Sequence, residues 1–170
     1  MRKWAEVNTS HGLAGAVILL CLVLAACTGG DRTGPVDIRW DQQSCERCAM
    51  SVGERLYAAQ VRGAPAGEKT RIFTFDDLGC AVIWLDKQPW KQDPRTEVWV
   101  TDAHSGAWLD ARQASFQTGH HTPMGYGLGA GSSAQNGALS FSEARDHILA
   151  VDRDRGHNHG DNHKHGGDES

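Results

Sequence analysis

The sequence predicts an α+β fold made of two similar small lobes, each formed by two strands followed by a helix. Short strand-like segments occur in both halves of the chain, and in each half an amphipathic helical pattern follows them. The lobes are expected over about residues 38–95 and 96–155. Three short motifs also recur in the same order, which indicates an internal repeat. The recurring pairs are Met50 and Met124, Ala59-Gln60 and Ala134-Gln135, and Thr74-Phe75-Asp76-Asp77 and Ser140-Phe141-Ser142-Glu143.

The first lobe is predicted as a hairpin followed by a helix. Residues 57–62 and 71–75 have strand composition and are separated by a turn-forming segment. Asp76 is expected to cap the helix that follows, which should end before Pro89. The apolar residues of this helix recur at helical spacing: Leu78, Ala81, Val82 and Leu85.

The second lobe begins with a predicted strand over residues 97–102, which is expected to pair with 107–109 across a tight turn. A glycine-rich stretch then leads to a short predicted strand over 138–141. Ser140 and the glutamate three residues later fit a capping box, so a helix should start there and end near Asp154.

The N-terminal residues 1–26 read as an export signal, because Arg2 and Lys3 precede an apolar run that is shorter than a membrane span of about 20 residues. The run ends in Leu24-Ala25-Ala26-Cys27, which resembles the lipobox of bacterial lipoproteins. That resemblance implies a lipid on Cys27, and an uncleaved anchor helix is the alternative. Residues 27–37 are expected to form a tether between the membrane and the fold.

The charge balance bears on the partners of the chain. It has 17 basic and 21 acidic residues, and it contains no cluster of Lys and Arg. Because nucleic-acid binding requires such a cluster to neutralise phosphates, nucleic acid is not an expected partner.

The C-terminal segment 156–170 contains no apolar residue and is predicted to be disordered. Its histidines alternate with Gly, Asn and Asp, a composition typical of loose binding to divalent metal ions. They are His157, His159, His163 and His165. A protein that buffers metal through this tail is therefore one functional hypothesis.

A Cys-x-x-Cys motif is the main candidate for chemistry. Cys45 and Cys48 can meet across a tight turn, and Met50 can lie on the same side as Cys48 if the stretch is extended. Thiolate and thioether are soft donors that favour Cu(I). Zinc would need four donors, and the sequence places no second pair nearby. The same motif is also typical of thiol-disulfide oxidoreductases, so that function remains an alternative.

Other candidate donors lie further along the chain. Met124 is flanked by Pro and Gly in a stretch without helical or strand periodicity, which indicates an exposed loop where a methionine can bind metal. His120 and His121 precede it and could supply imidazole. Cys80 is expected to be a buried, inert thiol, with a role as a resolving thiol as the alternative.

Five segments in order resemble the NosL family. They are Cys27 of the lipobox, Cys45-x-x-Cys48-Ala49-Met50, Phe75-Asp76-Asp77-Leu78-Gly79-Cys80, Trp108-Leu109-Asp110-Ala111, and Thr122-Pro123-Met124-Gly125-x-Gly127. The resemblance covers the chain from Cys27 to about Val151. It implies two similar α+β lobes and a lipoprotein at the periplasmic face of a membrane, more often the outer than the inner one. It also implies Cu(I) delivery for the assembly of nitrous oxide reductase, together with an ABC-type membrane complex.

The resemblance implies that copper binds to Cys48, Met50 and Met124, with Cys45 as a less certain further ligand. The family usually has glycine where this chain has Ala49, so a turn that required a positive φ would be strained here. We therefore expect a lipid-anchored Cu(I) metallochaperone rather than an enzyme, with the oxidoreductase and the tail-buffering protein as alternatives.

Overall fold

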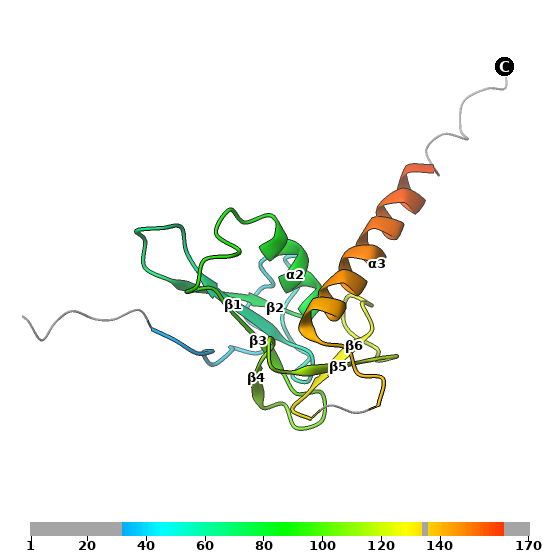
Figure 1. The fold of residues 1–170 in the computed structure, drawn as a ribbon, viewed down its shortest axis with the longest axis horizontal. Helices are drawn as coiled ribbons and strands as arrows, with labels where there is room; N and C mark the ends of the chain where they lie inside the picture. The colour runs from blue at the N-terminus through cyan, green and yellow to red at the C-terminus, as the bar shows by residue number, and fades with distance from the viewer. Residues whose placement is uncertain (1–31, 134–135, 162–170) are drawn as a thin grey trace, which may run out of the picture. The chain divides into compact units, whose positions relative to one another are not determined.

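The computed structural model describes residues 32–133 and 136–161 (Figure 1). Within these residues, two strands and a helix are followed by four strands and a second helix, which confirms the predicted α+β class. In chain order they are β1 Ala59–Gly63, β2 Arg71–Phe75, α2 Leu78–Asp86, β3 Glu97–Thr101, β4 Trp108–Asp110, β5 Ser115–Thr118, β6 Leu128–Gly131 and α3 Phe141–Asp161.

The larger sheet has four antiparallel strands in the order β2-β1-β3-β4. The predicted hairpin is present as β1 and β2, which pair from Ala59 opposite Phe75 to Gly63 opposite Arg71. The predicted pairing of the next two strands is also present, as β3 and β4. However, β3 pairs with β1 as well. The sheet therefore takes strands from both sides of the predicted lobe boundary at 95/96.

The ordered part of the chain begins earlier than the tether prediction implies. The fully buried side-chain amide of Gln60 bonds both the amide and the carbonyl of Val36 at 2.9 Å. Arg62 donates two hydrogen bonds to the carbonyl of Gly34. These contacts satisfy two buried polar side chains of β1, so residues 34–36 belong to the fold.

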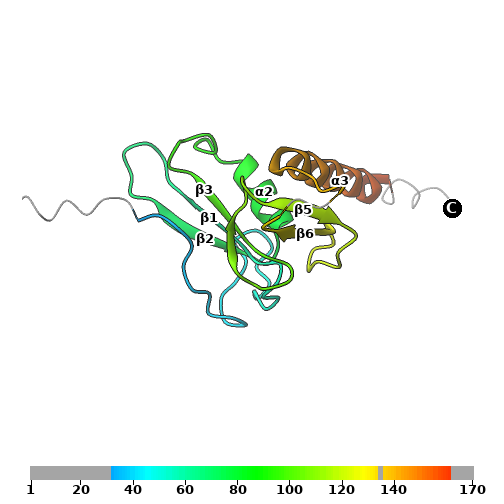
Figure 2. The same cartoon turned by 60° about the horizontal axis from the view of Figure 1, so that its bottom comes forward.

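Helix α2 lies against β1 and β2 and next to α3 (Figure 2). Its N-cap is Asp77, whose side chain accepts a hydrogen bond of 3.0 Å from the amide of Cys80. The prediction that Asp76 is the cap is therefore wrong by one residue. The helix ends at Asp86, before Pro89, as the sequence predicts.

The smaller sheet pairs β5 with β6, and both strands were absent from the sequence prediction. In β6, glycine occupies two of the four positions, so its composition does not favour a strand. The strand predicted over 138–141 is reduced to a single bridge between Leu139 and Phe116 of β5.

Helix α3 begins with the predicted capping box. The amide of Ser140 donates to Oε2 of Glu143 at 2.7 Å, and the Glu143 amide donates back to the Ser140 hydroxyl at 3.4 Å. The helix continues to Asp161, beyond the predicted end near Asp154. Its backbone thus extends through 156–161, which the sequence predicts as disordered. This segment contains no proline that would stop a helix, and the buried part of α3 supplies a formed helix to extend.

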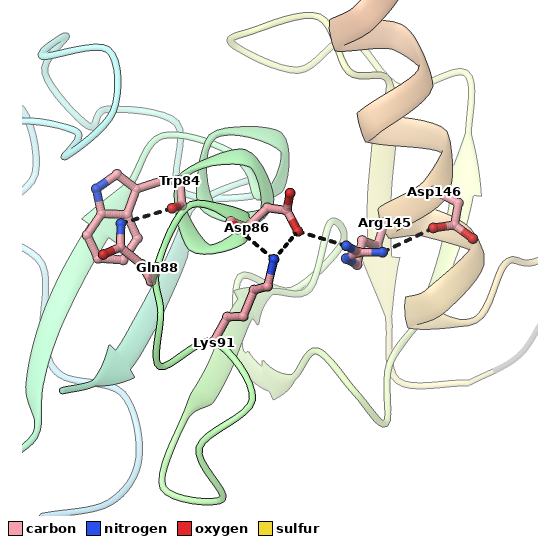
Figure 3. Close-up of polar contacts among 6 residues, drawn as sticks. All are labelled: Trp84, Asp86, Gln88, Lys91, Arg145 and Asp146. Atoms are coloured by element: carbon pink, nitrogen blue, oxygen red, sulfur yellow. Dashed lines mark hydrogen bonds and ion pairs between the residues drawn. The ribbon is translucent and has the colours of Figure 1, made fainter. Parts of the chain in front are cut away.

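A charged network joins the two helices at the C-terminal end of α2 (Figure 3). Oδ1 of Asp86 accepts from Lys91 at 3.0 Å and from Arg145 of α3 at 2.8 Å. These two cations hold the pKa of Asp86 below its usual value. The network fixes α3 beside α2 at the end opposite to the cysteines described below.

None of the described helices combines the length and the hydropathy needed to span a membrane. The predicted export signal and Cys27 lie outside the described residues, as does segment 162–170 of the tail.

Candidate metal centre

Three cysteines and one aspartate meet beside the N-terminal end of α2. The sulfur atoms of Cys45, Cys48 and Cys80 and a carboxylate oxygen of Asp76 all lie within 4.8 Å of one another. The three cysteines are free thiols. We call these four residues the thiol cluster, and their side chains form a group that can hold a metal ion.

The loop from Cys45 to Met50 is a closed turn. The amide of Cys45 donates to the carbonyl of Met50 at 2.8 Å, and the amide of Ala49 donates to the carbonyl of Cys45 at 3.0 Å. The Glu46 amide also donates to the carbonyl of Thr74 in β2, at 2.9 Å. These bonds place the two cysteines of the motif beside the end of β2, where the chain turns into α2.

The turn puts Ala49 in the left-handed region, with a φ of 62°. An alanine in this region costs about 1 kcal/mol relative to an unstrained backbone. The resemblance gives glycine at this position, and glycine adopts this φ without steric cost. The sequence predicts strain at Ala49 only if the turn requires a positive φ, and the structure shows that it does.

Asp76 is directed to the thiols. Its Oδ2 accepts a hydrogen bond from the thiol of Cys48, at 3.4 Å from the sulfur. Its Oδ1 is buried without a hydrogen-bond partner among the described residues, and the residue is only 2% exposed. A buried carboxylate oxygen without a donor is costly, so this atom is suited to a ligand that brings its own positive charge.

The three thiols differ in acidity. The hydrogen bond from Cys80 lowers the pKa of Cys45 to about 6, from an ordinary value of 9.0. Burial, as the main cause, raises the pKa of Cys48 to about 11. The pKa of Cys80 is raised first by its hydrogen bond to Cys45 and then by burial. At neutral pH the cluster therefore holds a thiolate on Cys45 and protons on the other two sulfurs.

Arg47 brings a cation to the cluster. Its Nη1 lies 3.7 Å from the sulfur of Cys80, and its Nη2 pairs with Asp152 of α3 at 3.0 Å. The hydroxyl of Tyr126 donates to the same Asp152 oxygen at 2.9 Å. The guanidinium is thus held in place next to the sulfurs and offsets negative charge on them.

The loop that carries Met124 is fastened to α2. Oδ2 of Asp77 accepts from the Thr122 hydroxyl and from the Met124 amide, each at 3.1 Å. Arg155 of α3 donates to the carbonyls of Met124 and Gly125 at 2.8 Å. The loop is therefore held between the first turn of α2 and the C-terminal half of α3.

Gly79 allows this loop to approach α2 closely. A Cβ atom on Gly79 would lie 2.0 Å from the ring of Tyr126, which is itself buried. Any side chain at position 79 would push the ring away and move the Met124 loop with it.

The structure therefore places the two loops that carry the predicted ligands beside the N-terminal end of α2. Cys48 belongs to the thiol cluster, and Met50, two residues later, is 54% exposed. Met124 is partly buried against the core, with its amide bound to the aspartate that follows Asp76. Cys45, the less certain ligand of the prediction, is a full member of the cluster.

None of the predicted histidines belongs to the thiol cluster among the described residues. The Nδ1 atom of His120 lies 3.3 Å from the hydroxyl of Tyr57, and its ring lines a cavity of about 520 Å³ beside β5 and β6. His121 is exposed. His157 and His159 belong to the backbone of α3, whereas His163 and His165 lie outside the described residues.

Two cluster members were missed as ligands by the sequence analysis. Cys80 was expected to be inert, and Asp76 was interpreted as a helix cap. The available signal was the pair of consecutive aspartates, because a helix start needs one cap and leaves the other carboxylate to be explained. The structure assigns the cap to Asp77 and turns Asp76 to the thiols.

The chain has a structural counterpart among solved proteins but no match at the level of sequence. No family model and no curated protein sequence matches the chain. The crystal structure of the copper chaperone NosL from Shewanella denitrificans is similar with a TM-score of 0.41 and 16% sequence identity, over 71% of this chain and 88% of that chain. At this level of similarity, the assignment of the metal centre rests on the geometry of the thiol cluster itself.

Proposed function

We propose that the chain is a carrier that holds one Cu(I) ion on the thiols of Cys45, Cys48 and Cys80 and passes it to a partner protein. The observation that carries the proposal is the convergence of three free thiols from two chain segments. Thiolate sulfur is the soft ligand that selects Cu(I) over harder ions. Since Cys45 is already ionised at neutral pH, binding starts on a thiolate.

The exposure of the donors increases from the buried thiols toward the surface, which suggests the route by which Cu(I) enters and leaves the site. Cys45 and Cys80 are at most 2% exposed, Cys48 is partly exposed, and Met50 is more than half exposed. A thioether at the surface is a soft but uncharged donor, so Met50 suits the step in which Cu(I) arrives or leaves. Met124 is the predicted second thioether, on the loop that Asp77 fastens to α2.

We also propose that the carrier works outside the cytoplasm, anchored by a lipid on Cys27 at the periplasmic face of a membrane. Its proposed client is nitrous oxide reductase, reached directly or through an ABC-type maturation complex. The ordered sequence motifs support this part of the proposal. It is tested by mixing the copper-loaded chain with metal-free reductase and measuring the copper spectrum of the reductase. A reductase that stays empty, while the carrier keeps its ion, would remove this client.

Copper binding itself is tested by anaerobic titration of the full, reduced chain with Cu(I) against a chromophoric chelator. We expect one tightly held ion per chain and weaker binding in Cys45→Ser, Cys48→Ser and Cys80→Ser, with smaller losses in Met50→Leu and Met124→Leu. His104→Asn serves as the control, because this exposed residue lies outside the cluster and was not a candidate ligand. Unchanged affinity in all three serine variants would overturn the proposal.

A thiol-disulfide oxidoreductase is the second candidate, favoured by the low pKa of Cys45 in a Cys-x-x-Cys motif. The accessible thiol, however, is Cys48, whose pKa is raised to about 11, whereas the acidic Cys45 is buried. An oxidoreductase needs its acidic thiol accessible to substrate. Catalytic disulfide exchange by the chain, retained in Met50→Leu and Met124→Leu and without copper binding, would favour this candidate over the carrier.

A further inference from the structure

The carboxylate of Asp76 gives the thiol cluster a fourth donor, and one of its two oxygens has no hydrogen bond. Three sulfurs alone account for a Cu(I) site, and they leave Oδ1 of Asp76 without a hydrogen bond among the described residues. The residue is 2% exposed, so solvent does not serve this atom freely. Its other oxygen already contacts the thiol of Cys48. The carboxylate is therefore held beside the thiols by one oxygen, while its other oxygen has no hydrogen bond among the described residues.

The cluster matches the size of a tetrahedral site. Zinc–sulfur bonds of about 2.3 Å place the sulfurs of a tetrahedral zinc site about 3.8 Å apart. The four donor atoms here are all within 4.8 Å of one another without an ion. Closing the sulfurs around a metal therefore requires their separations to shorten by at most about 1 Å.

We propose that the thiol cluster also binds a divalent thiophilic ion, represented by Zn(II), through Cys45, Cys48, Cys80 and Asp76. In this site Asp76 supplies the fourth ligand, which Zn(II) needs and Cu(I) does not. The inference rests on the proposed function, since the same thiols carry Cu(I). It also reverses the sequence-based exclusion of zinc, which found only two donors close together. Folding supplies the other two from the start of α2.

The donor types explain how one aspartate separates the two metals. Zn(II) accepts carboxylate oxygen as well as thiolate and is almost always four-coordinate in closed sites. Cu(I) is soft and gains little from a carboxylate. Removal of the carboxylate charge should therefore weaken Zn(II) binding much more than Cu(I) binding.

The neighbouring charges fit a divalent ion. Three thiolates and one carboxylate around Zn(II) leave two negative charges, and the guanidinium of Arg47, 3.7 Å from Cys80, lies beside them. Binding requires the protons of Cys48 and Cys80 to leave, so uptake of Zn(II) at neutral pH releases protons to the buffer. That release can be measured independently of affinity.

The test uses the full, reduced, metal-free chain in anaerobic titrations with Zn(II) and, separately, with Cu(I), each against a chelator. Co(II) replaces Zn(II) for spectroscopy, because tetrahedral thiolate coordination gives intense visible bands. We expect Asp76→Asn to weaken Zn(II) binding by at least about 10- to 100-fold and to change the Co(II) spectrum. Cu(I) affinity should change less than about threefold. Asp86→Asn removes the same charge at the opposite end of α2, where Asp86 pairs with Lys91 and Arg145, and should keep the Co(II) spectrum.

The outcomes for the two proposals are separable. If the wild-type chain binds Cu(I) but takes up no Zn(II), or if Asp76→Asn binds Zn(II) as tightly as the wild type, the zinc inference is overturned and the copper carrier stands. If the wild-type chain fails to bind Cu(I) but shows the four-ligand Co(II) spectrum, the copper carrier is overturned. Circular dichroism of each variant confirms that the comparison is made between folded chains.

Discussion

The amide of Met124 donates a hydrogen bond of 3.1 Å to Oδ2 of Asp77, the residue that caps α2. One carboxylate thereby fixes both the start of the helix that carries Cys80 and the loop that carries the second predicted thioether. The other oxygen of the same carboxylate accepts from the Cys80 amide at 3.0 Å. Helix capping and loop placement therefore depend on a single side chain.

Asp77→Ala should lower the free energy of unfolding by about 2 kcal/mol, since both the cap and the loop contacts are lost. Urea denaturation measures this change. Ser140→Ala is the matched control, because it removes the cap of α3 without touching the Met124 loop. We expect it to cost about 1 kcal/mol and to leave Cu(I) affinity unchanged. If the two variants change the Cu(I) affinity equally, the hydrogen bond between Asp77 and the Met124 loop has no role in the site.

Ala49→Gly should stabilise the chain by about 1 kcal/mol, because glycine removes the steric cost of a φ of 62°. Thermal or urea unfolding of the metal-free chain checks this. The control is the reverse change, Gly67→Ala, at a φ of 85° in open space. It should destabilise by a similar amount through the backbone alone. A loss of stability in Ala49→Gly would contradict the left-handed turn.

The metal-free chain should gain one thiolate with a midpoint near pH 6, on Cys45. The ultraviolet absorbance of the thiolate follows this titration. Because the hydrogen bond from Cys80 is the main cause of the shift, Cys80→Ser should move the midpoint upward. Cys48→Ser is the control and should leave a low midpoint. No absorbance change below pH 8 in the wild type would contradict the assignment.

The same shift predicts a pH dependence of stability. The pKa of Cys45 is about 6 in the folded chain and 9.0 as the ordinary value, so between these pH values the unfolded chain holds a proton that the folded chain lacks. The contribution of this thiol to stability is therefore complete above pH 9 and is lost as the pH falls toward 6. Urea unfolding across this window, compared with Cys45→Ala, measures it; equal pH dependence in the two chains would refute it.

Deletion of residues 162–170 should leave the single tight Cu(I) ion in place, because all four donors of the thiol cluster lie outside the deleted segment. Weak binding of Ni(II) or Cu(II) by His163 and His165 should disappear. Titration of the shortened and full chains with each metal makes the comparison. Loss of most Cu(I) uptake on deletion would instead support the tail-buffering alternative.

The sequence predicted the elements with local signals. Alternation identified β1 to β4, and the helical spacing with the Ser140–Glu143 capping box identified α2 and the start of α3. β5 and β6 were missed because glycine-rich strands form through pairing and packing, which composition does not report. The end of α3 was placed too early because the segment after Asp154 has no apolar residue to pack on a core. A helix that is already formed can nevertheless continue into such a segment.

Only those members of the site that are close in sequence could be predicted. Cys45, Cys48 and Met50 are close in sequence, so their proximity could be read directly. Cys80 and Asp76 join them only because the loop of the motif pairs with β2 and the chain turns into α2 at that point. The close approach of Tyr126 to Gly79 is likewise a tertiary contact that the sequence presents only as an ordinary glycine in a helix.

The number of thiols in the cluster has a consequence for the lifetime of the protein. Oxidation joins thiols in pairs, so a disulfide within the cluster always leaves one of the three cysteines single. When Cys45 pairs with Cys80, the single thiol is the partly exposed Cys48, which can form a mixed disulfide with another molecule in an oxidising compartment. A chain without its ion is therefore open to crosslinking, whereas a bound metal keeps all three sulfurs engaged. Metal supply would then govern how long each copy survives, in addition to what it delivers.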